Sequence, residues 1–264
     1  MPDLKVIAET LDEAAKKAQA TEQLSVQGNN LSLEQAYQVQ GLSIARRIAR
    51  GEVKVGIKMG FTSKAKMIQM GVDDLIWGVL TDKMTIAQNG YINLANYVHP
   101  RAEPEIAFLL KSPLSGEITI EQAQAAVEAV APAIEIIDSR YENFKFSLED
   151  VIADNSSSSS YVIGNWNSDL VAIDNLDMVM SIGERHTEAG NSNAILGDPW
   201  LSLIDASRLA GAAGQTLEAG EIVLAGAATA AVALQPGDSI LLTVESLGTV
   251  GFNVEGSHVE VNQS

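Results

Sequence analysis

The sequence predicts a mixed α+β fold in which helices flank an irregular β-structure. Two helical segments precede the first strand, and the last part of the chain reads as short strands separated by turns. Between them, strands and helices follow one another without a repeating strand–helix–strand unit. We count roughly five or six helices and about ten strands, which argues against a regular parallel α/β sheet.

The composition is that of a globular protein with a strongly acidic surface. Apolar residues make up 46% of the 264 residues and charged residues 19%, so the chain can bury a sizeable core. The formal charge of −17 repels phosphate backbones and anionic lipids, and we therefore set aside nucleic-acid and membrane-surface binding. The absence of cysteine excludes a disulfide, a thiolate nucleophile and a Cys-ligated zinc site.

The sequence contains no recognisable targeting segment. Its N-terminus is charged throughout and lacks the apolar centre of a signal peptide. The longest apolar stretch, residues 222–237, is interrupted by Gly and Pro and is shorter than the roughly 20 residues that a membrane-spanning helix needs. We therefore expect a cytoplasmic protein.

The N-terminal part of the chain, residues 1–52, predicts a helical region. Apolar residues recur at helical spacing over residues 4–20. A second helix over residues 32–51 begins with Ser32 and Gln35, whose spacing is typical of a capping box. Two helices are therefore expected before any strand.

We assign residues 53–264 to a β-rich catalytic domain that forms one structural unit with the helical region. It opens with a strand at residues 53–60, where apolar residues alternate with Lys and Gly. A short helix is predicted at residues 62–71. Further on, Asn89-Gly90 is the strongest two-residue signal for a β-hairpin.

The centre of the chain combines further strands with capped helices. In order, the predicted elements are a strand at residues 99–110, a helix from Thr119 that ends before Pro132, a strand at 133–140, a helix capped by Ser147 and Asp150, a strand at 161–164, and a helix at 198–211 with Asp198 as N-cap and Pro199 at its first position. The serine run 156–160 has the composition of a flexible linker. Because the composition does not change on either side of it, we favour one continuous domain.

Three acidic residues lie on strands that otherwise predict burial. Glu103 and Glu105 are two residues apart, so their side chains share one face of a strand. Glu135 lies among isoleucines. Buried carboxylates repel one another and lose hydration unless a cation lies between them. Three oxygen ligands without a nearby cysteine favour a hard divalent cation, Mg²⁺ or Mn²⁺, rather than zinc.

Other interpretations of these carboxylates stay open. Pro104 could mark a sheet edge on which Glu103 and Glu105 are solvated. His99 could add a metal ligand, although a hydrogen-bonding turn residue is the simpler interpretation. A general acid–base pair, as in glycosidases, is a third alternative, although adjacent strand positions do not straddle a scissile bond.

Taken together, four segments of the chain resemble the hydratase/decarboxylase branch of the fumarylacetoacetate hydrolase superfamily. The segments are VGIKMGFTSKAKMIQMGVDDLIWGVLTD at 55–82, RAEPEIAFLL at 101–110, APAIEIIDSR at 131–140 and DVIADNSSSSSYVIG at 150–164. The resemblance extends over residues 30–255 and keeps the order of the motifs. It implies a mixed, strongly bent β-structure flanked by helices.

The resemblance also implies the residues of the site. The family's metal is held by a Glu-x-Glu pair and a third Glu, which match Glu103, Glu105 and Glu135, and its active-site lysine matches Lys58. The residues that we expect in the substrate pocket are Gly60, Thr62, Ile76, Trp77 and Ser160. The alternative for Lys58 is a surface lysine on an edge strand.

The activity implied is metal-dependent loss of CO₂ from 2-oxo-3-hexenedioate, which gives 2-hydroxypenta-2,4-dienoate in the meta-cleavage pathway of aromatic catabolism. Hydratases of the same branch share this dienolate chemistry. They carry an acidic residue directly before an aromatic-glycine pair, where this chain has Ile76 before Trp77-Gly78. An apolar residue at that position favours decarboxylation over the addition of water.

Three alternatives and two partners complete these expectations. The alternatives are a hydratase, a C–C hydrolase and a non-catalytic partner subunit. None of the three histidines lies in a segment that suggests the His–Glu pair of a hydrolase, and a scaffold subunit would not need an intact metal triad. The resemblance implies association with 2-hydroxypenta-2,4-dienoate hydratase, and assembly into a homo-oligomer is left open.

Overall fold

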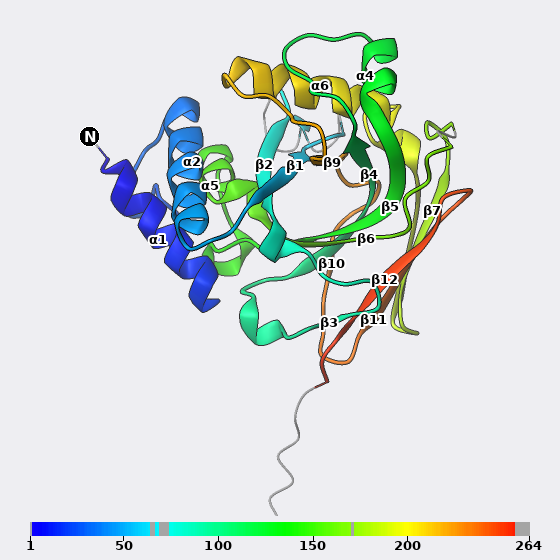
Figure 1. The fold of residues 1–264 in the computed structure, drawn as a ribbon. Coiled ribbons are helices and arrows are strands. Elements are labelled where there is room, and N and C mark those ends of the chain that lie inside the picture. The colour runs from blue at the N-terminus through cyan, green and yellow to red at the C-terminus, as the bar shows by residue number, and fades with distance from the viewer. Residues whose placement is uncertain (1, 64–66, 69–73, 170–171, 257–264) are drawn as a thin grey trace, which may run out of the picture.

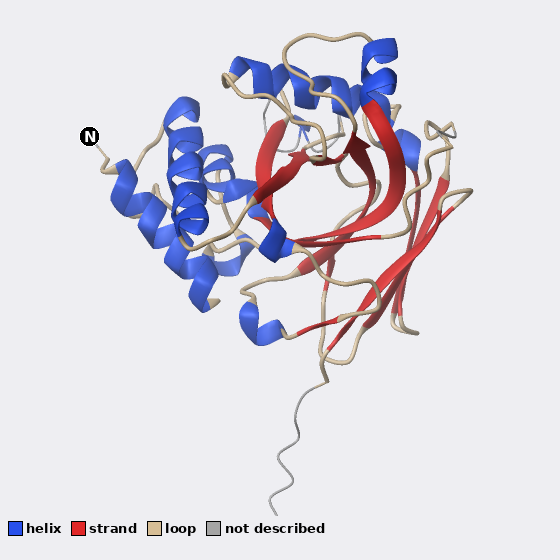
Figure 2. Ribbon diagram, in the orientation of Figure 1, coloured by secondary structure: helices blue, strands red, loops and turns tan. Residues whose placement is uncertain are grey.

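The fold consists of two β-sheets with helices on two sides (Figures 1 and 2). The computed structural model describes residues 2–63, 67–68, 74–169 and 172–256. Its α-helices are α1 (Leu4–Lys17), α2 (Leu33–Ala49), α4 (Ile120–Ala126), α5 (Leu148–Ala153) and α6 (Pro199–Ala212). Its strands are β1 (Lys54–Gly60), β2 (Ile76–Thr81), β3 (Tyr91–Ile92), β4 (Arg101–Leu110), β5 (Val127–Ile137), β6 (Ser158–Ile163), β7 (Asp177–Ile182), β8 (His186–Asn191), β9 (Ile222–Leu224), β10 (Val232–Ala233), β11 (Ser239–Val244) and β12 (Gly248–Val254).

The larger sheet curves into a half-barrel. Its strand order is β2-β1-β9-β4-β5-β6, and β10 pairs with the start of β4. The long strand β5 bends strongly, so that the two ends of the sheet face one another (Figure 1). The predicted α+β class and its strongly bent β-structure are therefore confirmed, and the concave side of this sheet is where inward-facing side chains meet.

The smaller sheet covers one side of the half-barrel. Its order is β3-β12-β11-β7-β8, and β11 and β12 lie against β5. The alternating burial along β11, Ser-Ile-Leu-Leu-Thr-Val, shows one face packed and one face exposed, as expected for a sheet with a single buried face. Helix α6 closes the end of the half-barrel, where Trp200 packs against Phe108 of β4.

The N-terminal helices form a separate hydrophobic cluster with α5. Helix α1 packs on α2, and α2 packs on α5; Ile7 and Leu11 are buried in this cluster together with Ile76 of β2. The predicted capping box is present, with Gln35 N donating to the Ser32 hydroxyl. The helical N-terminal region is therefore confirmed, and it abuts one wall of the half-barrel. None of the helices in the described ranges is both long and apolar enough to span a membrane.

Two predicted elements differ from the structure. The helix that begins after Thr119 ends at Ala126, because the β-branched residues that follow pair with β4 and extend β5 through Pro132. Asn89-Gly90 forms a tight turn but no hairpin, since the strand after it, β3, pairs in parallel with the distant β12. The short helix predicted at residues 62–71 lies largely outside the described residues.

Candidate active site

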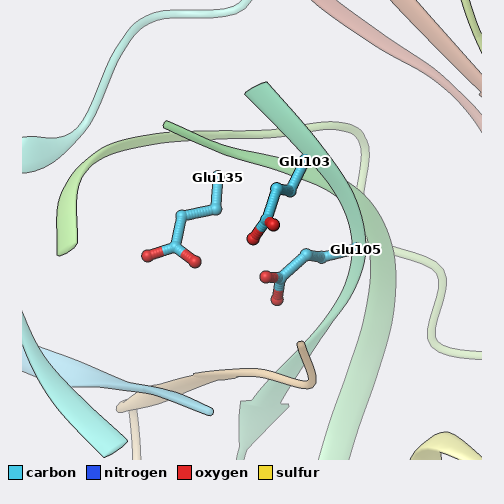
Figure 3. Close-up of side chains that lie close together, drawn as sticks. All are labelled: Glu103, Glu105 and Glu135. Atoms are coloured by element: carbon cyan, nitrogen blue, oxygen red, sulfur yellow. The ribbon is translucent and has the colours of Figure 1, made fainter. Parts of the chain in front are cut away.

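Three carboxylates converge on the concave side of the larger sheet. Glu103 of β4 pairs directly with Glu135 of β5, and Glu105 lies two residues further along β4 on the same face. One oxygen from each carboxylate lies within 4.8 Å of the other two, and the three side chains point toward one another (Figure 3). The interpretation as a solvated edge is wrong, because β4 lies between β5 and β9 and all three residues are at most 6% exposed.

The electrostatics of this cluster favour the binding of a cation. Burial and the charge of Glu135 raise the pKa of Glu105 well above its usual value, and burial also raises the pKa of Glu135. Glu105 Oε2 accepts a hydrogen bond of 2.7 Å from the Gly226 N–H. Oε1 of Glu105 and Oε1 of Glu135 are buried without a hydrogen-bond donor among the described residues. Buried carboxylate oxygens without donors are the ligands that a hard divalent cation would satisfy.

Lys58 places a positive charge beside the carboxylates. It lies on β1, between β2 and β9, and is 3% exposed, so the alternative of a surface lysine on an edge strand is wrong. Its Nζ lies 2.9 Å from Glu135 Oε2 and donates to the Ser156 carbonyl oxygen at 3.1 Å. Burial lowers the pKa of Lys58, but the attraction of the glutamates outweighs this effect and raises it. Lys58 is therefore positively charged at neutral pH.

The carbonyl that holds Lys58 belongs to an irregular turn, Asn155–Ser157, which we call the serine turn. All three of its residues have left-handed backbone angles, with φ of 52°, 52° and 56°, a conformation that costs roughly 1–2 kcal/mol for each non-glycine residue. The Asn155 side chain accepts from Val79 N at 2.8 Å and donates to Val79 O at 2.9 Å. The Ser156 hydroxyl donates to the Trp77 carbonyl at 2.7 Å. Hydrogen bonds to β2 therefore hold the serine turn in place.

Glu103 and Lys58 line one cavity of about 320 Å³. Its polar wall also contains Arg101, Ser156 and Ser157. The remaining walls are mainly apolar, and the residues that form them are Gly60, Phe61, Ile76, Ile137, Phe144, Phe146, Val151, Ala230 and Ala231. A mainly apolar cavity with a few converging charges is the usual form of a small-molecule site.

Two of the five residues expected in the substrate pocket, Gly60 and Ile76, line this cavity, and the other three do not. Trp77 follows Ile76 on β2, so its side chain points to the opposite face, where it stacks on Tyr37 with 5.5 Å between ring centroids. Thr62 is buried and lies against Gly226, whose N–H donates to Glu105 Oε2. Ser160 lies on β6 and its hydroxyl is 2.8 Å from the Tyr97 hydroxyl, beside a different cavity. These three expectations are corrected.

The sequence reasoning missed Arg101 and the aromatic wall of the cavity. A signal for Arg101 was present, because it lies two residues before Glu103 and so shares the face of the carboxylates. Its guanidinium carbon lies 4.1 Å from the centroid of the Phe144 ring. No sequence pattern predicts Phe144, which lies in an irregular segment and has a φ of 56°. His99 is not one of the clustered residues, and its Nδ1 is 3.0 Å from the Ser139 carbonyl.

Sequence comparison links most of the chain to one family and to enzymes of known activity. Residues 60–255 match the family described as fumarylacetoacetate (FAA) hydrolase C-terminal. A 4-oxalocrotonate decarboxylase from Pseudomonas sp is 56% identical over 251 residues, which cover 95% of this chain and 97% of the relative. A 2-hydroxyhexa-2,4-dienoate hydratase from Comamonas testosteroni is 34% identical and covers 90% of this chain and 92% of its own.

Solved structures show the same fold. The 4-oxalocrotonate decarboxylase from Pseudomonas putida G7, complexed with magnesium and adipate, matches with a TM-score of 0.91 and 34% identity over 95% of this chain and 97% of that chain. A fumarylpyruvate hydrolase from Pseudomonas aeruginosa, in complex with Mn²⁺ and pyruvate, matches with a TM-score of 0.60 and 14% identity over 77% of this chain and 90% of its own. The second likeness concerns the fold alone.

Proposed function

The chain belongs to the fumarylacetoacetate hydrolase family, and from this premise we propose that it is a metal-dependent carboxy-lyase that converts 2-oxo-3-hexenedioate (4-oxalocrotonate) to 2-hydroxypenta-2,4-dienoate and CO₂. The observation that carries the proposal is the convergence of three buried glutamates and Lys58 beside one cavity. The 56% identical decarboxylase supports the choice of substrate. The solved decarboxylase structure that resembles this chain contains magnesium and adipate, which is a dicarboxylate. It therefore supports a divalent cation and a dicarboxylate substrate.

Glu103, Glu105 and Glu135 are the residues that would hold the divalent cation. Their oxygens face one another, and two of these oxygens have no hydrogen-bond donor among the described residues. When bound, Mg²⁺ or Mn²⁺ supplies a Lewis acid for the 1-carboxylate and the 2-oxo group of a keto acid. Three carboxylates and one divalent cation leave a net negative charge, so a dianionic substrate needs a further cation beside the site.

Lys58 provides that positive charge. In the substrate, the C3–C4 double bond connects the 2-oxo group to C5, which carries the 6-carboxylate. When the C5–C6 bond breaks, CO₂ leaves, and the electron pair passes through the conjugated chain to the 2-oxygen. The charged Lys58, held by Glu135 and Ser156, stabilises the negative charge that develops on that oxygen. Protonation of the oxygen then completes 2-hydroxypenta-2,4-dienoate.

The apolar walls of the cavity favour decarboxylation over hydration. Ile76 lines the same cavity as Lys58. The side chains of Phe61, Phe146 and Val151 add to its apolar wall. Such walls position no water for addition to the diene, whereas loss of a carboxylate as neutral CO₂ is easier in a site of low polarity. Hydratase activity is the second candidate, because hydratases at 34% identity cover most of the chain.

The test is incubation of the protein with 2-oxo-3-hexenedioate and Mg²⁺, followed by ultraviolet spectroscopy and a parallel assay of CO₂. We expect one CO₂ for each substrate consumed, loss of activity after exhaustive chelation, and recovery with Mg²⁺ or Mn²⁺. Turnover that survives chelation would contradict the metal site. Hydration of 2-hydroxypenta-2,4-dienoate without release of CO₂ would identify a hydratase, and no activity on either compound would favour a non-catalytic subunit.

We also propose that the chain associates with a 2-hydroxypenta-2,4-dienoate hydratase. The dienol product ketonises in water, so a complex would pass it on before it is lost. The support is the family resemblance alone. Co-expression followed by size-exclusion chromatography should give one joint peak at micromolar concentration, and two separate peaks would argue against a stable complex.

A further inference from the structure

A second cavity lies between the N-terminal helices and the half-barrel, away from the candidate active site. Its volume is about 360 Å³, and it shares no lining residue with the cavity that contains Lys58. Five basic side chains line it, Lys16, Arg47, Arg50, Lys83 and Arg140, together with three acidic ones. The lining therefore has two more basic than acidic side chains, in a chain with a formal charge of −17.

The three acidic residues of this cavity are already hydrogen-bonded within the protein. Asp12 receives both terminal nitrogens of Arg50, at 2.6 and 2.7 Å, in a bidentate pair. Glu52 accepts a hydrogen bond of 2.6 Å from the Thr81 hydroxyl. Asp138 accepts from the backbone N–H groups of Val98 and His99. Acidic residues outside the lining pair with three more of the basic groups, Lys16 with Glu13, Lys83 with Asp82 and Arg140 with Asp154. Among the described residues, Arg47 is thus the basic group of the lining that has no ion pair within 4 Å.

Two guanidinium groups distinguish the cavity from an ordinary solvated surface. Arg140 is 2% exposed and is bound by Asp154 and by the carbonyl oxygens of Asp154 and Ser158. Arg47 is partly buried, and its guanidinium forms no hydrogen bond or ion pair with any residue in the described ranges. Burial, and then the like charge of Arg140, lowers the pKa of Arg47, while the charges of Glu52 and Asp12 act in the opposite direction. Arg47 is thus a partly desolvated cation that forms no direct ion pair within the described part of the chain.

Hydroxyl groups add possible donors to the lining of the same cavity. Tyr97 and Ser160 line the cavity, and their hydroxyl oxygens are 2.8 Å apart. Only one of their two hydroxyl hydrogens is needed for that contact, so the other is free to donate to a ligand. Ser159 adds a further hydroxyl to the lining. A guanidinium fork beside hydroxyl donors is the arrangement that recognises phosphate and carboxylate oxygens.

We propose that this cavity is a binding site for a small oxyanion, in which Arg47 provides the unpaired charge and the Tyr97–Ser160 pair a hydroxyl donor. Phosphate and carboxylate groups both present two oxygens on one central atom, and a guanidinium group can donate a hydrogen bond to each of these oxygens. Because Arg47 lies on α2, Ser160 on β6 and Tyr97 in the loop before β4, a bound anion would link the helical region to the larger sheet. The site does not depend on the proposed decarboxylase activity.

The test is calorimetric titration of the Mg²⁺-loaded protein with inorganic phosphate and, in a second arm, with succinate, at constant ionic strength set with NaCl. We expect one equivalent of at least one anion to bind in a saturable way that depends on Arg47, and the anion with the higher Arg47-dependent affinity identifies the class. Succinate that binds independently of Arg47 is assigned to the candidate active site, which is proposed to take dicarboxylates. Arg47→Met keeps the aliphatic stem and should weaken that binding at least tenfold, and Arg47→Lys should weaken it less. The matched control is Lys17→Met, which removes an exposed positive charge from α1 outside the cavity and should leave the affinity within twofold.

Three results would overturn the proposal. One is the absence of saturable binding of either anion to the parent protein. Another is equal affinity in the parent and in Arg47→Met, which would place the anion elsewhere. The third is an equal loss of affinity in Lys17→Met, which would indicate a general effect of net charge. Circular dichroism of Arg47→Met and Arg47→Lys shows whether both are folded, and Arg47→Lys carries the test if Arg47→Met is not.

Discussion

The candidate site is built from two regions of opposite character, and the difference between them shows how the protein positions charge. The metal-binding strands, β4 and β5, are regular, and their hydrogen-bonded register alone brings Glu103 opposite Glu135. The serine turn, Asn155–Ser157, is irregular and has three consecutive left-handed residues. Its geometry depends on side-chain hydrogen bonds to β2. The carboxylates thus lie on regularly paired strands, whereas the position of the Lys58 ammonium group beside them depends partly on a strained turn.

Lys58 is where the two regions meet, so its replacement should have the largest effect. Lys58→Met keeps the length of the stem and removes the charge that contacts Glu135 and the Ser156 carbonyl. We expect kcat to fall by about 10²–10³-fold, the usual loss when one electrostatic contact to a developing oxyanion is removed. Steady-state kinetics with saturating Mg²⁺ measures this loss. An increase in KM with unchanged kcat would make Lys58 an anchor for a substrate carboxylate instead.

Glu135→Gln tests the metal-binding strands alone. The amide keeps the shape of the side chain but loses one ligand charge. We expect the affinity for Mg²⁺ to fall by at least about 100-fold, because the loss of an outer-shell partner alone costs roughly 10–100-fold. Burial raises the pKa of Glu135 in the folded chain, so the ionised carboxylate destabilises the metal-free protein at neutral pH. The substitution should therefore leave the Tm of the metal-free protein unchanged or higher. A metal titration that is identical to that of the parent would place Glu135 outside the site.

The same contrast explains which parts of the site the sequence could predict. Residues two apart on a strand share a face wherever the strand lies, so Glu103 and Glu105 could be paired before the structure was known. Ile76 and Trp77 are adjacent and must face opposite sides, yet the sequence does not say which side holds the cavity; only the packing of Trp77 on Tyr37 decides it. The end of α4 was misplaced for a related reason, because pairing with β4 overrides the helical pattern after Ala126.

Residues of the irregular segments could not be predicted at all. The serine run was expected to contribute Ser160, but Ser156 and Ser157 line the cavity instead. A run of identical residues carries no register, and the left-handed angles of the serine turn arise from contacts with Trp77 and Val79, which are distant in sequence. The division of the chain at residue 52 likewise remains a prediction.

Ile76→Asp tests whether the apolar wall beside these two regions selects decarboxylation. A carboxylate at this position of the cavity repels a dicarboxylate substrate and admits water. We expect kcat/KM for decarboxylation to fall roughly tenfold, which corresponds to about 1.4 kcal/mol, and Ile76→Asn serves as the uncharged control with a smaller loss. Hydratase activity need not appear, since one residue does not also position a water. If Ile76→Asp decarboxylated at the parental rate, the apolar wall would not explain the choice between the two reactions.

Two substitutions of Asn155 in the serine turn should separate the contribution of its side-chain hydrogen bonds from the cost of its left-handed backbone. Asn155→Ala removes both bonds to Val79 and places a residue without a compensating side chain in the left-handed region. We expect a loss of about 1–3 kcal/mol in the free energy of unfolding and a several-fold lower kcat, because the Ser156 carbonyl no longer fixes Lys58. Asn155→Gly also removes the bonds but relieves the strain at φ 52°, so denaturant unfolding should show a smaller loss by roughly 1 kcal/mol.

In both Asn155 variants the affinity for Mg²⁺ should stay close to that of the parent, because the register of β4 and β5 does not involve the serine turn. Metal binding that fell together with kcat would show that the two regions are one cooperative unit rather than a rigid frame and a separate support. Unchanged kcat in Asn155→Ala would instead show that Lys58 is positioned by Glu135 alone. Lys58 Nζ lies 2.9 Å from Glu135 Oε2 and 3.1 Å from the Ser156 carbonyl oxygen, so either contact is short enough to orient the ammonium group. The strained turn is therefore needed for catalysis only if the contact with the Ser156 carbonyl contributes to the position of Lys58.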